Sequence, residues 1–241
     1  MRRFWDHIIH PVFVEENVKS IIEIGCEFGK NTLKILEYCS ENNAKLISID
    51  PAPTFDANLL EKENDNFKMI KKISLNALPE ISDYDAVLID GDHNWYTVYH
   101  ELKLIEKNAL KRGEFPIIFL HDTDWPYGRR DMYYFPDTIP KEYRRGFAKK
   151  GMLPGHNRLI DMDLDLNNES INRDLFNALF EGGERNGVLT AIEDFIKETV
   201  IPLSFYNLPQ NHGLGIILQK NEKLEMFIEK TIENYNNCNI H

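Results

Sequence analysis

The chain has 241 residues, of which 42% are hydrophobic and 28% charged, a composition that excludes a disordered or collagen-like chain. No stretch approaches the ~18 uninterrupted apolar residues of a membrane-spanning helix, and polar residues interrupt any signal-peptide core at the amino end, so we expect a cytoplasmic protein with no membrane partner. The 39 acidic residues outnumber the 28 basic ones and give a formal charge of −11, which disfavours binding to nucleic acid.

Through residue 121, short β-branched apolar runs alternate with longer amphipathic segments, which is the pattern of a parallel sheet flanked by helices. Helices are expected before residue 20, at 31–39 and at 96–108, where apolar residues recur at helical spacing. The predicted strands are Ser20–Gly25, Lys45–Asp50, Phe67–Lys71, Tyr84–Asp90 and Phe115–His121. This half of the chain therefore predicts a doubly wound α/β fold.

The alternation stops between residues 123 and 186, a segment rich in Gly, Pro and aromatic residues. A connection of that length is usually functional or a small insertion, so we expect an insertion or lid over the active site within a single domain, 1–241. Regular structure resumes with a helix at 187–200, strands at 203–206 and 212–218, and a helix at 222–235. Because only Asn207–Asn211 separate the two late strands, they should form an antiparallel hairpin.

The end of the first predicted strand carries the features of a nucleoside site. Gly25 and Gly29 allow a tight turn and a close approach of the backbone to a ligand. Asp50 ends the second strand about 20 residues later, where a carboxylate can accept the hydroxyls of a ribose. Glu27 stands at the middle glycine of a diphosphate-binding turn and would repel a diphosphate, whereas Glu23 can accept an ammonium group. The alternative is a turn with a purely structural role.

A second group of polar residues follows the fourth and fifth predicted strands. Asp90 and Asp122 should converge at the carboxyl edge of the sheet, and two carboxylates suit a hard cation such as Mg²⁺ or Mn²⁺. Such an ion can hold two oxygens of a vicinal diol, and His93 is placed to remove the hydroxyl proton. In the alternative interpretation, the two aspartates only cap helices and His93 is a surface histidine.

These motifs resemble those of a known enzyme family. Glu-x-Gly-x-x-x-Gly at 23–29, followed by Asp50, resembles the first motif of S-adenosylmethionine-dependent methyltransferases of Rossmann-like fold. Asp-Gly-Asp-His at 90–93 followed by His-Asp at 121–122 resembles the metal-dependent branch that includes sugar O-methyltransferases and cephalosporin-hydroxylase-like proteins. The resemblance implies an α/β, Rossmann-like fold: a seven-stranded, mostly parallel sheet with an antiparallel last strand, helices on both faces, and an insertion after the fifth strand.

The resemblance also implies roles for individual residues. S-adenosyl-L-methionine would be bound by Glu23, Gly25, Glu27, Gly29, Asp50, Ser74 and Asp90. A divalent metal, Mg²⁺ or Mn²⁺, would be held by Asp90, His121 and Asp122, and the catalytic residues would be His93 and Asp90. Ser74 stands where the family often has an acidic residue near the adenine.

The expected function is O-methyl transfer to a hydroxyl of a sugar, nucleotide sugar or saccharide-containing small molecule. The basic run at 141–150 could clamp a phosphate of such an acceptor, and the aromatic clusters at 125–127 and 133–135 could stack on a sugar ring. The alternatives are another Rossmann-fold enzyme, including a nucleotide-sugar transferase that uses Asp161 and Asp163, and a catalytically silent cofactor-binding protein. The resemblance leaves room for a homo-oligomer.

Overall fold

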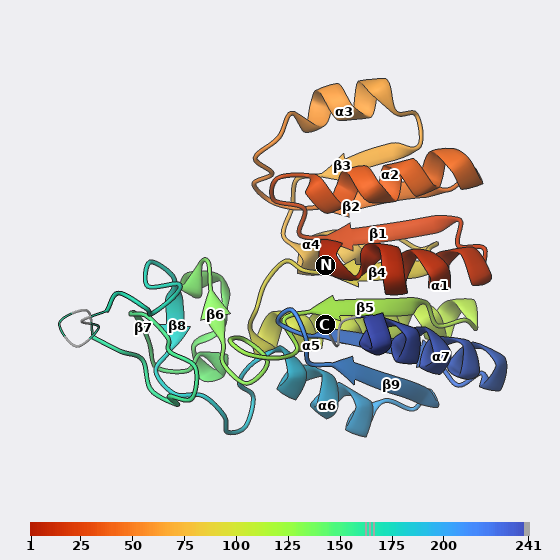
Figure 1. Cartoon of the computed structure of the whole chain (residues 1–241). Helices are drawn as coiled ribbons and strands as arrows, with labels where there is room; N and C mark the ends of the chain where they lie inside the picture. The colour runs from red at the N-terminus through yellow and green to blue at the C-terminus, as the bar shows by residue number, and fades with distance from the viewer. Residues whose placement is uncertain (162, 164, 166, 239–241) are drawn as a thin grey trace.

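The main sheet has seven strands in the order β3-β2-β1-β4-β5-β10-β9 (Figure 1). The computed structural model describes residues 1–161, 163, 165 and 167–238. The strands are β1 Ser20–Ile24, β2 Lys45–Ile49, β3 Phe67–Ile70, β4 Ala86–Ile89, β5 Ile117–His121, β9 Leu203–Leu208 and β10 Leu214–Gln219. Within this sheet β10 runs antiparallel to both of its neighbours, and the other pairings are parallel. The predicted sheet, with its antiparallel last strand, is confirmed.

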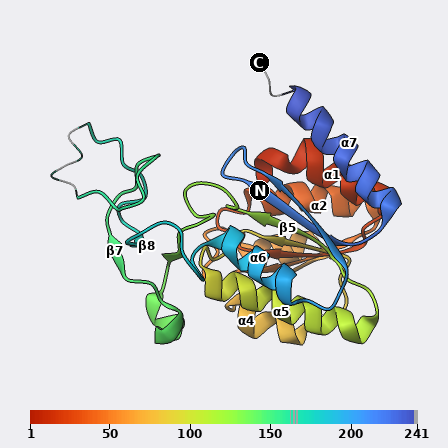
Figure 2. The ribbon, with the colours of Figure 1, turned by 90° about the horizontal axis from the view of Figure 1, so that it is seen from below.

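Helices cover both faces of the sheet (Figure 2). One face carries η1 Arg2–Phe4, η2 Trp5–Ile9, α1 His10–Glu15, α2 Lys30–Asn42, α3 Ala57–Glu63 and α7 Glu222–Cys238. The other carries α4 Ser74–Ala77, η3 Leu78–Glu80, α5 Trp95–Arg112 and α6 Val188–Glu198. None of the helices described here has the length and apolar character that crossing a bilayer requires.

Local sequence explains where the longest of these helices begins and ends. The side chain of Asn94 accepts a hydrogen bond from the backbone N–H of Thr97, 2.9 Å away, and so caps the start of α5. Gly113 ends α5 in the left-handed conformation, with a φ of +80°. The apolar residues that α5 buries, including Val98, Leu102 and Ile105, follow the helical spacing on which the prediction for 96–108 was based.

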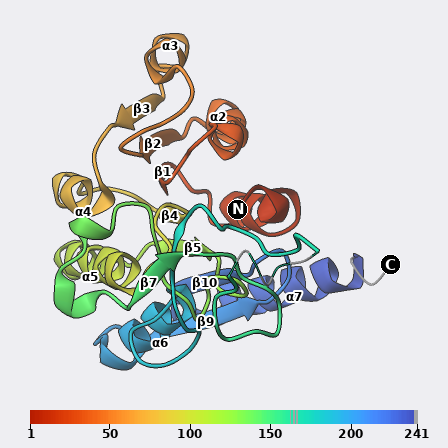
Figure 3. The same cartoon turned by 90° about the vertical axis from the view of Figure 1, so that its left-hand side faces the viewer.

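The insertion contains a small sheet of its own, which the sequence did not predict. Its strands are β6 Met132–Tyr133, β7 Phe147–Lys149 and β8 Phe176–Ala178, paired antiparallel in the order β6-β8-β7. Two short helical turns, η4 Pro136–Thr138 and η5 Lys141–Tyr143, lie between β6 and β7. The insertion stands beyond the carboxyl ends of the parallel strands (Figures 1 and 3).

Asp131 fastens the start of this insertion to two helices of the main body. Its Oδ1 atom accepts hydrogen bonds from the backbone N–H groups of Trp95 and Gly187, each 2.7 Å away, at the starts of α5 and α6. Its Oδ2 atom accepts a hydrogen bond from the hydroxyl of Tyr133, also 2.7 Å away. Burial raises the pKa of Asp131 to about 6, although the three donors favour the charged form. The insertion is thus fixed where it leaves the fold.

Candidate active site

A cavity of about 1040 Å³ opens at the carboxyl ends of β1, β2, β4 and β5. This is the edge at which open α/β sheets bind their ligands. Of the predicted site residues, those that line the cavity are Gly25, Glu27, Asp50, Ser74, Asp90, His93, His121 and Asp122. Glu23 and Gly29 are not part of its lining. The topology therefore brings most of the predicted residues into one space.

Gly25 occupies a position that has no room for a side chain. Its φ is +82°, and a Cβ atom there would lie 2.3 Å from the carbonyl oxygen of Asp90 and 2.4 Å from the Cα atom of Gly91. The backbone that follows β1 consequently touches the backbone that follows β4. Gly29 precedes α2 with a φ of +71°, and its Cβ atom would lie 3.0 Å from the ring of Phe55. Both glycines shape the turn between β1 and α2.

Asp50 ties that turn to the end of β2. Its Oδ2 atom accepts hydrogen bonds from the backbone N–H groups of Cys26 and Glu27, each 3.0 Å away. Its Oδ1 atom accepts one from the N–H of Ala52, 2.8 Å away. Because a carboxylate has about four lone-pair sites, Asp50 can hold the loop and still accept hydrogen bonds from a ligand in the cavity.

Glu23 lies behind the wall of the cavity. Its carboxylate accepts hydrogen bonds from Asn31, Thr32 and Ser48 at 2.7–2.9 Å. Burial raises the pKa of Glu23, and these donors oppose that shift. Only 1% of the residue is exposed. The expectation that Glu23 meets an ammonium group therefore differs from the structure, in which its oxygens are taken by protein donors and Glu23 holds the turn from within.

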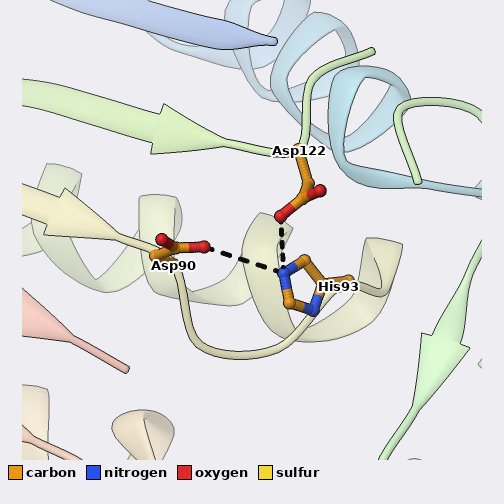
Figure 4. A group of neighbouring side chains, drawn as sticks. All are labelled: Asp90, His93 and Asp122. Carbon is orange, nitrogen blue, oxygen red and sulfur yellow. Dashed lines mark ion pairs between the residues drawn. The ribbon is translucent and has the colours of Figure 1, made fainter. Parts of the chain in front are cut away.

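Asp90, His93 and Asp122 converge where β4 and β5 end (Figure 4). The Nε2 atom of His93 lies 2.8 Å from Oδ2 of Asp122 and 3.8 Å from Oδ1 of Asp90. The Nδ1 atom of His121 lies 2.8 Å from the same Asp122 oxygen and 3.3 Å from the same Asp90 oxygen. Each of the two imidazoles thus lies close to both carboxylates.

The charges of this cluster stabilise one another. Burial lowers the pKa of an imidazole, but the negative charge of Asp122 raises that of His93 well above its usual value. Burial acts the same way on His121, and the charge of Asp90 raises its pKa to about 9. Although burial opposes ionisation of Asp90, the charges of His121 and the amino group of Met1 hold its pKa well below the usual range. The two carboxylates therefore favour the protonated form of both imidazoles.

The same cluster has a donor set that suits a divalent cation. Asp90, His93 and Asp122 each offer a ligand atom, and these atoms lie within 4.8 Å of one another. Carboxylate oxygens suit Mg²⁺ and Mn²⁺, while an imidazole nitrogen favours transition metals, so Mn²⁺ fits the whole set. From the sequence, His121 was expected among the ligands and His93 as the base. The signal for His93 was the Asp-x-x-His spacing, which brings both side chains to one point.

Aromatic side chains line the other part of the cavity. These side chains belong to the insertion, which contributes Trp125, Tyr127, Tyr134, Phe135, Ile139, Ile171 and Asn172 to the lining. The basic run at 141–150 is not part of the lining; Arg144 pairs with Asp137, and Lys150 pairs with Asp161. Asp163, the partner of Asp161 in the alternative transferase interpretation, is also absent from the lining. Neither segment reaches a ligand in this cavity.

His212 and Glu101 lie at or near the cavity. His212 lines the cavity, because β10 is antiparallel and so begins at the edge where β5 ends. Glu101 is fully buried on α5, and neither of its carboxylate oxygens has a hydrogen-bond partner among the described residues. Burial raises the pKa of Glu101 to about 8.

Comparison with known proteins identifies a methyltransferase-domain match in the first half of the chain. Residues 22–123 match the family model of a methyltransferase domain, a span that begins in β1 and ends just after Asp122. The structure is similar to that of S-adenosylhomocysteine-bound methyltransferase PaMTH1 from Podospora anserina (TM-score 0.49, 16% identity, 88% of this chain and 77% of that one). It is also similar to 1,6-didemethyltoxoflavin-N1-methyltransferase from Burkholderia thailandensis (TM-score 0.46, 13% identity, 91% and 82%). No curated protein sequence matches the chain.

Proposed function

We propose that the chain, whose residues 22–123 match a methyltransferase-domain model, is an S-adenosylmethionine-dependent methyltransferase that transfers the methyl group to a hydroxyl of a sugar or saccharide-containing small molecule with the help of a divalent metal. The observation that carries this proposal is the position of Asp90. Its backbone packs against Gly25 in the turn proposed for the methyl donor, and its side chain belongs to the Asp90–His93–Asp122 cluster. Donor and acceptor would then meet in one cavity.

We assign the donor end of the cavity to Gly25, Glu27, Asp50 and Ser74, all of which line it. Asp50 would accept the ribose hydroxyls with the lone pairs that its backbone hydrogen bonds leave over. The carboxylates of Glu27 and Asp50 favour a cationic sulfonium and disfavour a diphosphate, because they place negative charge beside the ligand. Glu23 supports this end by fixing the turn and makes no contact with the donor.

We assign the cation to Asp90, His93 and Asp122. When bound, such an ion lowers the pKa of a coordinated hydroxyl and orients it. The protein residues fix the position of the acceptor. Asp90 and Asp122 are anchored at neighbouring strand ends, and His93 becomes the third ligand once its Nε2 proton is displaced. His93 is then a ligand in preference to the base that the sequence suggested, since its Nε2 atom points at the two carboxylates.

The lining of the acceptor end supports an uncharged ring. Trp125, Tyr127, Tyr134 and Phe135 offer flat apolar faces of the kind that pack on sugar rings. Among the described residues of the insertion, no Lys or Arg lines the cavity, so it offers no cationic partner for a phosphate there. The insertion therefore favours a simple saccharide over a nucleotide sugar, and the basic lining residues Arg2 and Lys30 lie outside it.

A methyl-transfer assay with radiolabelled S-adenosylmethionine tests the proposal. The acceptors are a panel of methyl glycosides, with UDP-glucose as a phosphate-bearing comparison and a primary amine as a nitrogen nucleophile, each with Mn²⁺ or with chelator. We expect transfer to glycoside hydroxyls that requires metal. Asp122→Asn should lose most of this activity, while the matched variant Asp161→Asn, in the insertion and outside the cavity lining, should keep it. Transfer to nitrogen alone, or undiminished transfer under chelation, would contradict the proposal.

A further inference from the structure

The structure points to His212 as the general base of the methyl transfer, an inference that rests on the proposed function. His212 lies just before β10 and lines the cavity together with Asp90, Asp122 and the aromatic side chains of the acceptor end. Its ring meets that of His121 edge-on, with 6.4 Å between the ring centres. It therefore belongs to the acceptor end and not to the donor end.

A hydrogen bond fixes which nitrogen of His212 can take a proton. The Nδ1 atom lies 3.1 Å from the carbonyl oxygen of Trp125. A carbonyl oxygen only accepts hydrogen bonds, so Nδ1 carries the hydrogen in this contact. In the neutral ring the lone pair then lies on Nε2. His212 thus presents the lone pair of Nε2 in its neutral form, and among the described residues no carboxylate forms an ion pair with its ring.

The backbone around His212 holds the ring against the loop that follows Asp122. The N–H of Asp124 donates to the carbonyl oxygen of His212, 2.8 Å away. The next residue, Gly213, has a φ of +92°, and a Cβ atom there would lie 2.4 Å from the nitrogen of Asp124. His212 itself has a φ of +71°, a conformation that few residues other than Gly, Asn, Asp and His adopt. A loop with a constrained backbone at this point is a common setting for functional groups.

The other two histidines of the cavity are engaged in a different way. His93 directs Nε2 at Asp122, and its Nδ1 atom is buried without a partner among the described residues. His121 directs Nδ1 at both Asp90 and Asp122. These contacts commit both rings to the carboxylates that would hold the cation. His212 contacts a neutral carbonyl instead and is exposed to solvent.

The step balances as a simple displacement. The acceptor O–H gives its proton to Nε2 of His212 while the oxygen attacks the methyl carbon of the sulfonium. The O–CH₃ bond forms, the S–CH₃ bond breaks, and its electron pair stays on sulfur, giving a neutral thioether. His212 leaves the step as an imidazolium and, because the ring is exposed, returns the proton to water.

His212→Asn removes the base and suits the backbone, since Asn tolerates a positive φ. Single-turnover methylation of a methyl glycoside that the wild type accepts should slow by about 10²–10⁴-fold, with unchanged affinity for S-adenosylhomocysteine. Added imidazole should restore part of the rate. The control is His156→Asn, an exposed histidine outside the cavity lining, which should behave as wild type. A rate within tenfold of wild type in His212→Asn would overturn the assignment.

A second measurement needs no turnover. Long-range ¹⁵N–¹H spectra of the histidine rings, with His212 assigned by its loss in His212→Asn, report which nitrogen is protonated in the neutral ring. We expect an Nδ1–H tautomer, and an Nε2–H tautomer would overturn the base role. If the wild type methylates no hydroxyl in the panel, the proposed function fails and the base role falls with it. If the wild type is active and only the His212 results disagree, the proposed function stands and the base role alone is lost.

Discussion

Gly25 and Asp90 touch through their backbones, since a Cβ atom on Gly25 would stand 2.3 Å from the carbonyl oxygen of Asp90. The two residues directly follow neighbouring strands, β1 and β4, that pair in parallel. This contact sets how far the donor turn stands from the carboxylate cluster. The spacing between the two ends of the cavity is thus built into the main chain.

Replacing Gly25 tests how strongly this contact constrains the fold. Gly25→Ala should lower the free energy of unfolding, because Ala pays for a φ of +82° and the added methyl group meets backbone atoms that must shift. Gly113→Ala is the matched control: its φ is +80°, but nothing lies within 4 Å of the new Cβ atom. We expect Gly113→Ala to lower the free energy of unfolding by about 1 kcal/mol. Gly25→Ala should lower it by ~1–3 kcal/mol more than Gly113→Ala does, as measured by urea unfolding. Equal losses would show that the close approach costs nothing.

Asp50→Asn should weaken binding of S-adenosylhomocysteine. The amide group brings N–H donors toward the backbone N–H groups of Cys26 and Glu27, both of which donate to Oδ2 of Asp50, and it removes the charge offered to the ribose. We expect a loss of roughly 1.5–3 kcal/mol, the range for a hydrogen bond to a charged group, measured by titration calorimetry. Asp56→Asn is the control, because Asp56 caps α3 outside the cavity lining and Asn caps a helix equally well. Equal affinities in wild type and Asp50→Asn would remove Asp50 from the donor site.

Binding of Mn²⁺ should release protons and grow stronger as the pH rises. In the metal-free cluster the folded pKa of His121 is raised to about 9, and that of His93 is also raised. Imidazole nitrogen binds metal only when deprotonated, and a cation at Asp90 and Asp122 displaces the charge that holds these protons. Apparent affinity should therefore increase between about pH 6.5 and 9. Calorimetry in two buffers of different ionisation enthalpy counts the protons, and a count of zero at pH 7 would contradict the cluster as described.

Glu101→Gln should stabilise the protein in alkaline solution. The folded pKa of Glu101 is raised to about 8 by burial, above its unfolded value, so the folded state binds the extra proton and wild-type stability falls as the pH rises from about 4.5 to 8. Gln keeps the shape and cannot ionise. At pH 8.5 we expect a gain of about 1–3 kcal/mol in the free energy of unfolding. Glu106→Gln on the same helix should instead lose stability, because Glu106 pairs with Lys103 and Thr199. A gain in both variants would point to a general charge effect.

The sequence was sufficient to predict the main sheet and the sheet edge at which the cavity lies. Parallel strands bring their carboxyl ends to one edge, so Asp50, Asp90 and Asp122 could be placed near one another from strand order alone. The hairpin of β9 and β10 followed from a connection too short for a helix. The order β6-β8-β7 could not be predicted, because its strands have two or three residues and Met132 pairs with Asn177, far along the chain.

The roles of single side chains were harder to predict than their positions. Glu23 was expected to face a ligand, but Thr32 and Ser48 donate to its carboxylate from α2 and β2, and no periodicity in the sequence reports such a contact. The direction of the His93 ring depends on Asp122, which belongs to another strand and itself has a φ of +59°. Side-chain orientation of this kind is set by tertiary packing and could be seen only in the structure.

The three hydrogen bonds that the carboxylate of Asp131 accepts limit how an acceptor could enter. Asp131 directly precedes β6, and its carboxylate accepts hydrogen bonds from the backbone at the starts of α5 and α6. An outward movement of the whole insertion would therefore break both of these hydrogen bonds. Any hinge that opens the cavity must therefore lie after Tyr133 in the chain. Tyr134 and Phe135, which line the cavity and remain 48% and 65% exposed, come directly after that point. We therefore expect an acceptor to enter by rearrangement of these aromatic rings, while the backbone anchored by Asp131 stays in place.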